Sequence, residues 1–217
     1  MKSFIVLCGG KSKRMGQDKG SLNIDGKPMI VHVIENLAVI SDEIVLVLRD
    51  ENQVDDYRKL LKELTLSNKT KLKICTDLLK DQGPLAGILI GLKHVESDRA
   101  MVIPCDSPFV SELFVNKMFL YSKETNFDAI VPKWSNGRLE PLHSIYKKDL
   151  EPVIQKLLEE HTRDVKSFIR KLKVKYIDAE SLDGTGRSFF NINSAEDISK
   201  FKNNRFKKII TQIKTEK

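Results

Sequence analysis

The residues whose types and spacing could do chemistry are densest in a loop near the N-terminus. Two consecutive glycines, Gly9 and Gly10, allow backbone N–H groups to approach a ligand with no Cβ in the way. The residues that follow supply cationic and hydroxyl donors: Lys11, Ser12, Lys13, Arg14 and Lys19. Such donors around a glycine turn are typical of anion binding. The loop therefore predicts a phosphate-rich ligand, although its spacing matches neither the Walker A loop nor the G-x-G-x-x-G fingerprint.

A second candidate is Asp106, which lies between Pro104 and Pro108 directly after an apolar run. A carboxylate held rigidly at the end of a buried strand is a hard oxygen ligand, of the kind that binds Mg²⁺ jointly with substrate phosphates. Asp106 could instead cap the helix expected near Ser111, but Ser107 and Ser111 can do so themselves. We therefore expect Asp106 to bind a metal ion.

Asp77 and the turn Gly83–Gly87 are less specific candidates. Asp77 could meet a nucleotide or assist the metal ion, and it could also be an ordinary turn aspartate. The turn has the sequence GPLAG, which exposes backbone and could pack against a base or a ribose. A helix with Pro in its first turn would have such a start without any ligand.

The cysteines and histidines are not spaced for catalysis or metal binding. Cys8, Cys75 and Cys105 are an odd number with no C-x-x-C spacing, and each ends an expected strand, as buried structural cysteines do. A catalytic thiol at Cys8 or Cys105 is the alternative, since both lie where a ligand would bind. The histidines lack ligand spacing, and we expect surface or groove positions for all four: His32, His94, His143 and His161.

Regular elements must position these residues, and the first half of the chain alternates strand and helix patterns. Continuous apolar runs predict strands at 4–7, 43–48, 72–75 and 100–105. Helical spacing of apolar residues predicts helices at 28–37, 54–66 and 85–95. This alternation predicts a layered α/β fold with a mostly parallel sheet. Because ligands bind beyond the carboxyl ends of such strands, the loops at 9–19, 77–87 and 106–108 should converge on one edge.

The second half of the chain predicts an antiparallel excursion followed by more helix. A strand at 127–132, a polar turn at 134–138 and a returning strand at 140–146 would form one wall of a substrate groove. Further segments follow: helices at 149–159 and 163–172, a strand at 174–178 and a loop at 184–188. Ser194, with Asp197 three residues later, resembles a capping box for a final helix.

Composition and charge describe one domain with a basic tail. The chain has 217 residues, 41% of them apolar and 31% charged. No apolar run approaches the roughly 18 residues of a membrane span, so we expect a cytoplasmic protein without membrane contact. Almost all of the net charge of +7 lies in residues 199–217, which hold seven Lys or Arg and one Glu. Residues 1–198 are nearly neutral, which argues against nucleic-acid binding. We expect one domain at 1–198 and a tail at 199–217 whose apolar spacing favours a helix.

The motifs as a set resemble one family. From Gly9 to Pro28 the chain matches G-G-x-S-x-R-M-G-x-D-K-x-x-L-x-x-x-G-x-P at every fixed position. Four further signatures follow in the same order: GPLAGI at 83–88, PCDSPF at 104–109, RLEPLHSIY at 138–146 and FFNINSAEDI at 189–198. The chain thus resembles the molybdenum cofactor guanylyltransferases over Phe4 to Ile198. One departure is the end of the second strand, where relatives commonly carry an Asn and this chain reads Val47-Leu48-Arg49, with Asn52 the nearest amide.

The resemblance implies a Rossmann-like nucleotidyltransferase fold of three α/β/α layers. It implies Mg²⁺-dependent transfer of GMP from GTP to molybdopterin, with release of pyrophosphate. The residues that it assigns are Arg14, Lys19 and Asp106 to catalysis; Leu7, Cys8, Gly9, Gly10, Lys19, Asp77, Gly83 and Asp106 to GTP; Arg14, Asn191 and Asn193 to molybdopterin; and Asp106 to the metal. Cofactor-delivery or insertion proteins are further partners that such an enzyme would meet.

Two alternatives belong to different classes. A nucleotidyltransferase of the same fold could use CTP or activate a sugar phosphate, but the Gly-Gly pair and Asp18-Lys19 favour the guanylyl branch. A non-catalytic nucleotide-binding partner protein would keep the glycine loop and lose the acid for the metal, whereas Asp106 is present.

Overall fold

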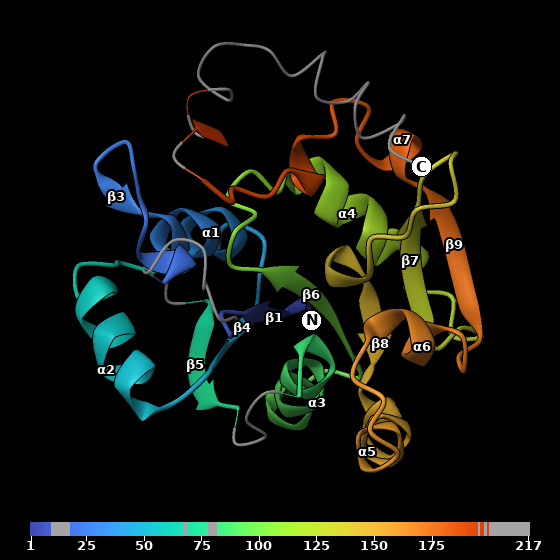
Figure 1. Cartoon of the computed structure of the whole chain (residues 1–217). Coiled ribbons are helices and arrows are strands. Elements are labelled where there is room, and N and C mark those ends of the chain that lie inside the picture. The colour runs from blue at the N-terminus through green and yellow to red at the C-terminus, as the bar shows by residue number, and fades with distance from the viewer. Residues whose placement is uncertain (10–17, 67–68, 78–81, 195, 198, 200–217) are drawn as a thin grey trace.

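The computed structural model describes residues 1–9, 18–66, 69–77, 82–194, 196, 197 and 199, and it has helices on both faces of a seven-stranded sheet (Figure 1). The strands lie in the order β5-β4-β1-β6-β8-β7-β9. Along the chain they are β1 (Ser3–Leu7), β4 (Glu43–Leu48), β5 (Lys71–Thr76), β6 (Arg99–Pro104), β7 (Ala129–Lys133), β8 (Ile145–Lys147) and β9 (Val174–Asp178). The short strands β2 (Asn23–Ile24) and β3 (Lys27–Pro28) pair separately. The predicted three-layer α/β fold is confirmed.

The sheet is mostly parallel because only β8 runs against its neighbours. Strands β5, β4, β1 and β6 are parallel, β8 is antiparallel to both β6 and β7, and β9 is parallel to β7. Leu7 of β1 is in register with Val47 of β4 and Pro104 of β6. The chain therefore leaves β1, β4 and β6 at one edge of the sheet, which is where the sequence placed its candidate loops.

Helices cover the two faces in separate groups. In chain order they are α1 (Met29–Ala38), α2 (Glu51–Leu60), α3 (Pro84–His94), α4 (Glu112–Tyr121), α5 (Glu151–Glu159), α6 (Val165–Ile169) and α7 (Ala179–Leu182). Helices α1, α2, α4 and α7 pack on the face that carries Phe4 and Val6, and α3, α5 and α6 pack on the face that carries Ile5 and Leu7. Figure 1 shows α1 and α4 above the sheet and α3 and α5 below it.

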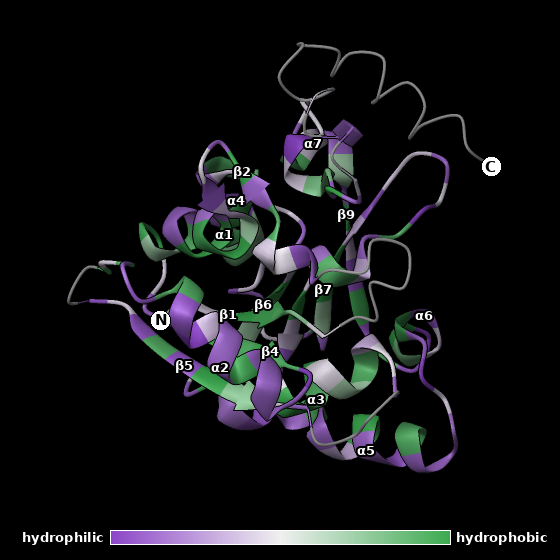
Figure 2. Ribbon diagram, turned by 60° about the vertical axis from the view of Figure 1, so that its left-hand side comes forward, coloured by the Kyte–Doolittle hydropathy of each residue, from purple (hydrophilic) through white to green (hydrophobic). Residues whose placement is uncertain are grey.

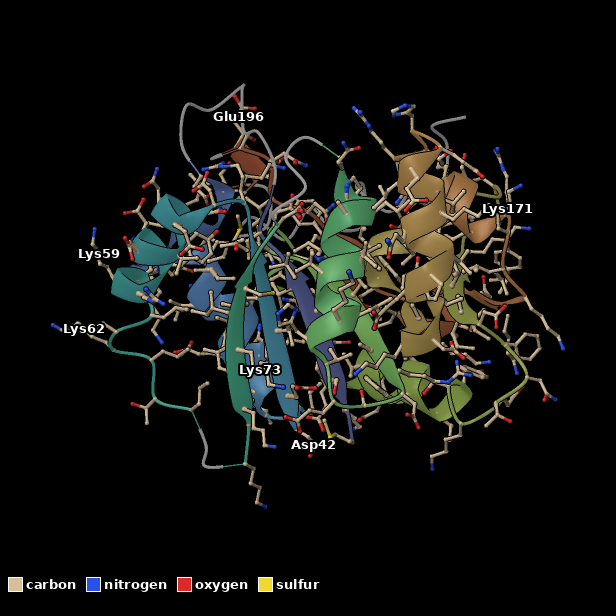
Figure 3. All side chains as sticks on the ribbon, turned by 90° about the horizontal axis from the view of Figure 1, so that it is seen from below. Asp42, Lys59, Lys62, Lys73, Lys171 and Glu196 are labelled. Atoms are coloured by element: carbon tan, nitrogen blue, oxygen red, sulfur yellow. The ribbon has the colours of Figure 1, made fainter. Side chains whose placement is uncertain are left out.

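Two buried faces explain why the central strands are apolar without alternation. Every residue of β1 and β4 is buried, and in Figure 2 the hydrophobic colour runs through β4 and β6 while α2 is largely hydrophilic. Only one stripe of α2 is buried, at Gln53, Val54 and Tyr57. Charged side chains such as Lys59, Lys62 and Lys171 lie at the periphery of the molecule (Figure 3).

Several predicted boundaries are wrong for identifiable reasons. Helix α2 begins at Glu51 and not at residue 54, because the Asp50 carboxylate caps it by accepting from the Gln53 N–H. The predicted returning strand at 140–146 is mostly a 3-10 turn, Pro141–His143, since Pro141 has no N–H for a ladder; only β8 remains extended. Helix α6 is shorter than predicted, with Asp164 as its cap.

The C-terminal predictions have separate outcomes. Asp197 N donates to Ser194 Oγ at 3.3 Å, which is one of the two bonds of the predicted capping box. The Asp197 carboxylate accepts from Asn193 N at 2.9 Å, one residue before the N–H that the box would use. The predicted tail lies outside the described residues from 200 onward. In the described part of the chain, no helix has both the length and the apolarity to cross a membrane.

Candidate active site

The centre of the candidate site is an ion pair between two predicted residues from distant parts of the chain. Lys19 begins a 3-10 turn, Lys19–Ser21, and Asp106 follows β6. Lys19 Nζ lies 2.8 Å from Asp106 Oδ2 and donates to Asn193 Oδ1 at 2.6 Å. One ammonium group therefore joins the loop after β1, the end of β6 and the C-terminal segment.

Asp106 has acceptor capacity beyond its contact with Lys19. Its second oxygen, Oδ1, is buried and accepts no hydrogen bond from any described residue. A buried carboxylate oxygen without a partner is costly, so its surroundings favour a cation or a donor at that position. A divalent ion held by one carboxylate and by substrate phosphates fits this arrangement. The described residues form no cluster of three or more His, Cys, Asp or Glu side chains that could hold a metal ion by themselves.

The two ends of the glycine loop are fastened to helix α2. Gln53 Nε2 donates to the carbonyl of Cys8, at 3.0 Å, and to Asp18 Oδ2. Asp18 Oδ1 accepts from Tyr57 Oη at 2.6 Å and from Gly20 N at 2.9 Å. Cys8 precedes the loop and Asp18 follows it, so Gln53 and Tyr57 fix the positions at which the loop leaves and rejoins the fold. We call Asp18, Gln53 and Tyr57 the loop clamp.

Gln53 and Tyr57 of the loop clamp are buried, and Asp18 is half-buried. Tyr57 is 1% exposed, and a Cβ at Gly20 would lie 2.0 Å from its hydroxyl, so only glycine allows this approach. Burial raises the pKa of the Tyr57 hydroxyl, which therefore stays protonated and donates. Burial also raises the pKa of the Cys8 thiol. A protonated, buried thiol is a poor nucleophile, which weighs against the catalytic-thiol alternative at Cys8.

Leu7, Cys8 and Gly9 were predicted to contact the nucleotide, and they differ in how accessible their backbone groups are to a ligand. The Leu7 carbonyl accepts from Cys105 N at 3.0 Å, and Cys8 N donates to the Val47 carbonyl at 2.9 Å, so these groups extend the sheet. Gly9 is exposed, and a Cβ built on it would meet no described atom within 4 Å. Of the three residues, Gly9 offers the most open backbone.

Asp77 and Gly83 lie at the same edge of the sheet as the Lys19–Asp106 pair. Asp77 follows β5, and its N–H donates to the Leu48 carbonyl at 2.6 Å. Gly83 is the N-cap of α3 with φ of +73°, and a Cβ there would lie 3.2 Å from the Arg163 carbonyl oxygen. The backbone thus requires glycine at 83 whether or not a ligand binds. Gly10 and Arg14, the remaining predicted residues, lie outside the described residues.

Asn191 and Asn193, which were predicted for the pterin side, both lie beside Asp106. Ile192 N between them donates to the Asp106 carbonyl at 2.8 Å. Asn191 Oδ1 accepts from Ser107 Oγ at 2.6 Å, and Ser107 Oγ lies 3.0 Å from His143 Nε2. The structure therefore brings together Lys19, Asp106, Asn191 and Asn193.

His143 was predicted at a surface or groove position, and that prediction is wrong. The side chain is 1% exposed, and burial lowers its pKa. The prediction failed because His143 follows a proline turn that directs it under the site, where Ser107 is its partner. Sequence reasoning also missed Gln53 and Tyr57, although their four-residue spacing on an amphipathic helix does place them on one face.

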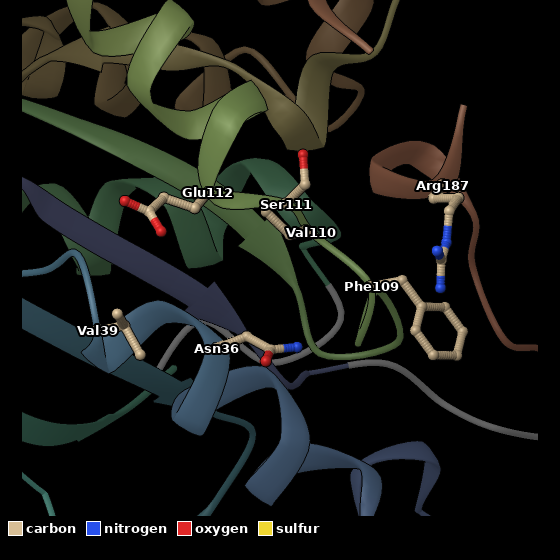
Figure 4. Close-up of a pocket in the computed structure, with 7 residues that line it drawn as sticks. All are labelled: Asn36, Val39, Phe109, Val110, Ser111, Glu112 and Arg187. Atoms are coloured by element: carbon tan, nitrogen blue, oxygen red, sulfur yellow. The ribbon is translucent and has the colours of Figure 1, made fainter. Parts of the chain in front are cut away.

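A hollow lies between the C-terminal end of α1 and residues 109–112, which follow Asp106 in the chain (Figure 4). It has a volume of about 350 Å³, and its lining residues are Asn36, Val39, Phe109, Val110, Ser111, Glu112 and Arg187. Asn36 Nδ2 donates to the Pro108 carbonyl at 2.6 Å, and Ser111 caps α4 through the Phe114 N–H at 3.2 Å. Ser111 is thus the cap of α4, which leaves the Asp106 carboxylate available for the site.

Comparisons with known proteins agree with this arrangement. Residues 4–176 match the family profile "MobA-like NTP transferase domain". A probable molybdenum cofactor guanylyltransferase from Methanothermobacter thermautotrophicus is 36% identical over 200 residues, which covers 91% of this chain and 98% of the relative. A protein of the same description from Methanosarcina mazei is 34% identical over 202 residues, covering 91% of this chain and 88% of the relative.

A solved structure extends the similarity to the fold. The molybdopterin-guanine dinucleotide biosynthesis protein A of Archaeoglobus fulgidus superposes with a TM-score of 0.77 at 27% identity, covering 98% of this chain and 100% of that protein. The chain therefore belongs to the family of MobA-like NTP transferases that includes the molybdenum cofactor guanylyltransferases, and it is a nucleotidyltransferase.

Proposed function

We propose that this protein transfers GMP from GTP to molybdopterin or its metal complex, with Mg²⁺, and releases pyrophosphate. The observation that carries the proposal is the Lys19–Asp106 pair at 2.8 Å, whose second carboxylate oxygen is buried without a partner in the described part of the chain. The names of the relatives support the choice of substrates.

The proposed reaction needs little acid–base chemistry from the protein. The terminal phosphate of molybdopterin is already an anion near neutral pH, so its oxygen can attack the α-phosphorus of GTP without a general base. A bond forms between that oxygen and the α-phosphorus, and the bond from the α-phosphorus to the bridging oxygen breaks as pyrophosphate leaves. The scheme asks no proton transfer of His143, which is buried with its Nε2 3.0 Å from Ser107 Oγ.

The main work of the residues is then to hold two anions together. The Lys19 ammonium supplies positive charge, and the Asn193 and Asp106 oxygens orient it. In the proposal, Gly9, Gly10, Asp77 and Gly83 lie along the nucleotide, and Arg14, Asn191 and Asn193 lie along the pterin. Asp106 would hold Mg²⁺, which when bound neutralises charge on the phosphates.

The experiment offers the purified protein each of the four α-labelled NTPs with molybdopterin and Mg²⁺. We expect label from GTP to enter the acceptor, and the chelator EDTA to stop the transfer until Mg²⁺ is restored. Asp106→Ala is the matched control for contaminating activity. Transfer from CTP in place of GTP would favour the cytidylyl alternative, and transfer from none of the four would favour a non-catalytic nucleotide-binding protein.

A further inference from the structure

A hydrogen-bonded chain of three polar side chains leads from the core, where His143 and Ser107 are buried, to the half-buried Asn191 on the acceptor side of the site. His143 Nε2 lies 3.0 Å from Ser107 Oγ, and Ser107 Oγ lies 2.6 Å from Asn191 Oδ1. The three residues are 36 and 84 positions apart in the sequence, so each comes from a different segment. Asn191 is one of the residues placed along the pterin above, and the roles of His143 and Ser107 behind it are still to be explained.

Counting hydrogens gives the chain a direction. A serine hydroxyl has one hydrogen, and Ser107 donates it to Asn191 Oδ1. Ser107 can therefore only accept from His143, so the imidazole must carry its proton on Nε2. The Nε2–H group of His143 is thus the donor at the buried end of this series of hydrogen bonds. At the other end, the side-chain oxygen of Asn191 is occupied by the hydrogen bond from Ser107.

The side-chain amide nitrogen of Asn191 remains available to donate hydrogen bonds to a ligand in the site. An amide whose oxygen is anchored must turn its two N–H donors the other way, and Asn191 Nδ2 has no acceptor among the described residues. The same holds for Asn193, whose oxygen accepts from Lys19 Nζ at 2.6 Å. Both amides thus present donors, and the group that they suit is an acceptor such as a phosphate or a carbonyl oxygen.

His143 is held firmly enough to impose this direction. Its backbone N–H donates to the Glu140 carbonyl at 3.0 Å, and its ring packs edge-on against Phe189 with centroids 5.5 Å apart. Glu140 is in turn fixed, since its Oε1 accepts from Trp134 Nε1 at 2.7 Å and from Arg138 Nε at 3.1 Å. A buried imidazole in such a setting has little freedom to rotate away from Ser107.

We propose that His143 is a positioning residue, which acts through Ser107 to turn the Asn191 amide nitrogen toward the acceptor substrate. The inference rests on the proposed function, because it concerns the acceptor side of that same site. It adds a residue that does not touch substrate and whose identity nevertheless sets what the site recognises there.

The kinetic test uses two substitutions of similar size. His143→Gln keeps an N–H donor close to the position of Nε2, whereas His143→Met fills the space without a donor. We expect His143→Met to raise KM for molybdopterin about tenfold, the effect of losing one buried hydrogen bond, and to leave KM for GTP within about twofold. His143→Gln should restore KM for molybdopterin to within about threefold of the parent. Equal kinetics for the two variants, or an equal rise in both KM values, would overturn the proposal.

A double substitution separates positioning from packing. In a Ser107→Ala protein the hydrogen-bond chain from His143 to Asn191 is already interrupted. Adding His143→Met should therefore change KM for molybdopterin by less than about twofold. A full further tenfold rise would mean that His143 acts independently of Ser107 and would contradict the proposal. Thermal melting of each variant identifies any that fail to fold.

A spectroscopic measurement keeps the inference testable without turnover. In the full-length protein with ¹⁵N-labelled histidine, the ring nitrogens of His143 report which one carries the proton, and His143→Gln assigns the signals. We expect a proton on Nε2. A proton on Nδ1 alone would reverse the direction of the hydrogen bonds between His143 and Asn191 and would refute the inference. If the parent transfers no GMP to molybdopterin, the proposed function fails, and the tautomer still decides whether the chain runs from His143 to Asn191.

Discussion

In the proposed function, the nucleotide side and the acceptor side of the site rest on polar networks that differ in how the sequence supplies them. The loop clamp of Asp18, Gln53 and Tyr57 comes from one β-α-β-α stretch and includes an ionised carboxylate. The proposed acceptor side contains His143, Ser107 and Asn191, which are neutral and come from three distant segments. Charge-assisted bonds within one stretch suit a loop that must be held at both ends. A series of hydrogen bonds between neutral side chains, with a fixed donor-to-acceptor direction, is suited to orienting a side-chain amide.

The largest effect is expected from the substitution of Asp106, the residue that both sides of the site share. Asp106→Ala should lower kcat at least about a thousandfold, because it withdraws the carboxylate that orients Lys19 and that would hold Mg²⁺. Melting temperature and circular dichroism should stay near those of the parent, since Ser111 and not Asp106 caps α4. A variant that keeps turnover within tenfold of the parent would show that Asp106 is not at the centre of the site.

The next largest effect is expected at Lys19. Lys19→Ala should lower kcat/KM for GTP about a hundredfold, because a positive charge beside the phosphates is lost. Lys27→Ala is the matched control, since Lys27 is a lysine of the short strand β3 that pairs with Glu35 at 2.8 Å in an exposed ion pair. Equal effects of the two substitutions would assign Lys19 to general surface charge.

Tyr57→Phe tests the loop clamp with the smallest change of shape. It removes the hydroxyl that donates to Asp18 at 2.6 Å and leaves the ring in the core. We expect KM for GTP to rise about fivefold and stability to fall by about 1 kcal/mol, with KM for molybdopterin unchanged. This is the opposite pattern to the one expected for His143→Met. If both variants changed both KM values together, the two networks would not be separate supports.

The same contrast explains how much the sequence could predict. Strands β1, β4 and β6 were predicted because two buried faces make them continuous apolar runs. Lys19 was predicted because it follows the glycine turn after the first strand, and Asp106 because it lies between Pro104 and Pro108 directly after another. Gln53 was missed because the helix was predicted to begin after it, at its first apolar residue. His143 was missed because a buried histidine is recognisable only by its partner, and Ser107 is 36 residues away.

Glu43, at the opposite edge of the sheet, offers a control: its substitution should lower stability and leave activity unchanged. Glu43 is fully buried and accepts from Lys73 Nζ at 2.6 Å and from Ser3 Oγ at 2.7 Å. Burial alone would raise its pKa, but the hydrogen bonds from Lys73, Glu96 N and Ser3 outweigh it and the pKa is lowered. A lowered folded-state pKa means stability that is present above the unfolded-state value and is lost as pH falls through the folded-state value.

Glu43→Gln should therefore destabilise the protein by about 1–3 kcal/mol near neutral pH and flatten the fall of stability below about pH 4.5. Urea titrations at pH 7, 5 and 3.5 measure this. Both KM values and kcat should stay within about twofold of the parent at a temperature where the variant is folded. A selective change in KM for GTP would show that the two edges of the sheet are coupled.

The smallest kinetic effect is expected for removal of the basic tail. All residues in the proposed site precede position 199, and residues 199–217 hold seven basic side chains and one acid. A chain that ends at Asn203 should therefore transfer GMP to free molybdopterin within about twofold of the parent, because neither the loop clamp nor the chain from His143 to Asn191 loses a member. Its affinity for an acidic partner protein, measured by titration at increasing salt, should fall and lose its salt dependence. A truncated protein that melts as the parent does but no longer transfers GMP to free molybdopterin would place the tail in the acceptor side of the site. The acceptor side would then draw on a fourth distant segment, and its contrast with the compact nucleotide side would be sharper still.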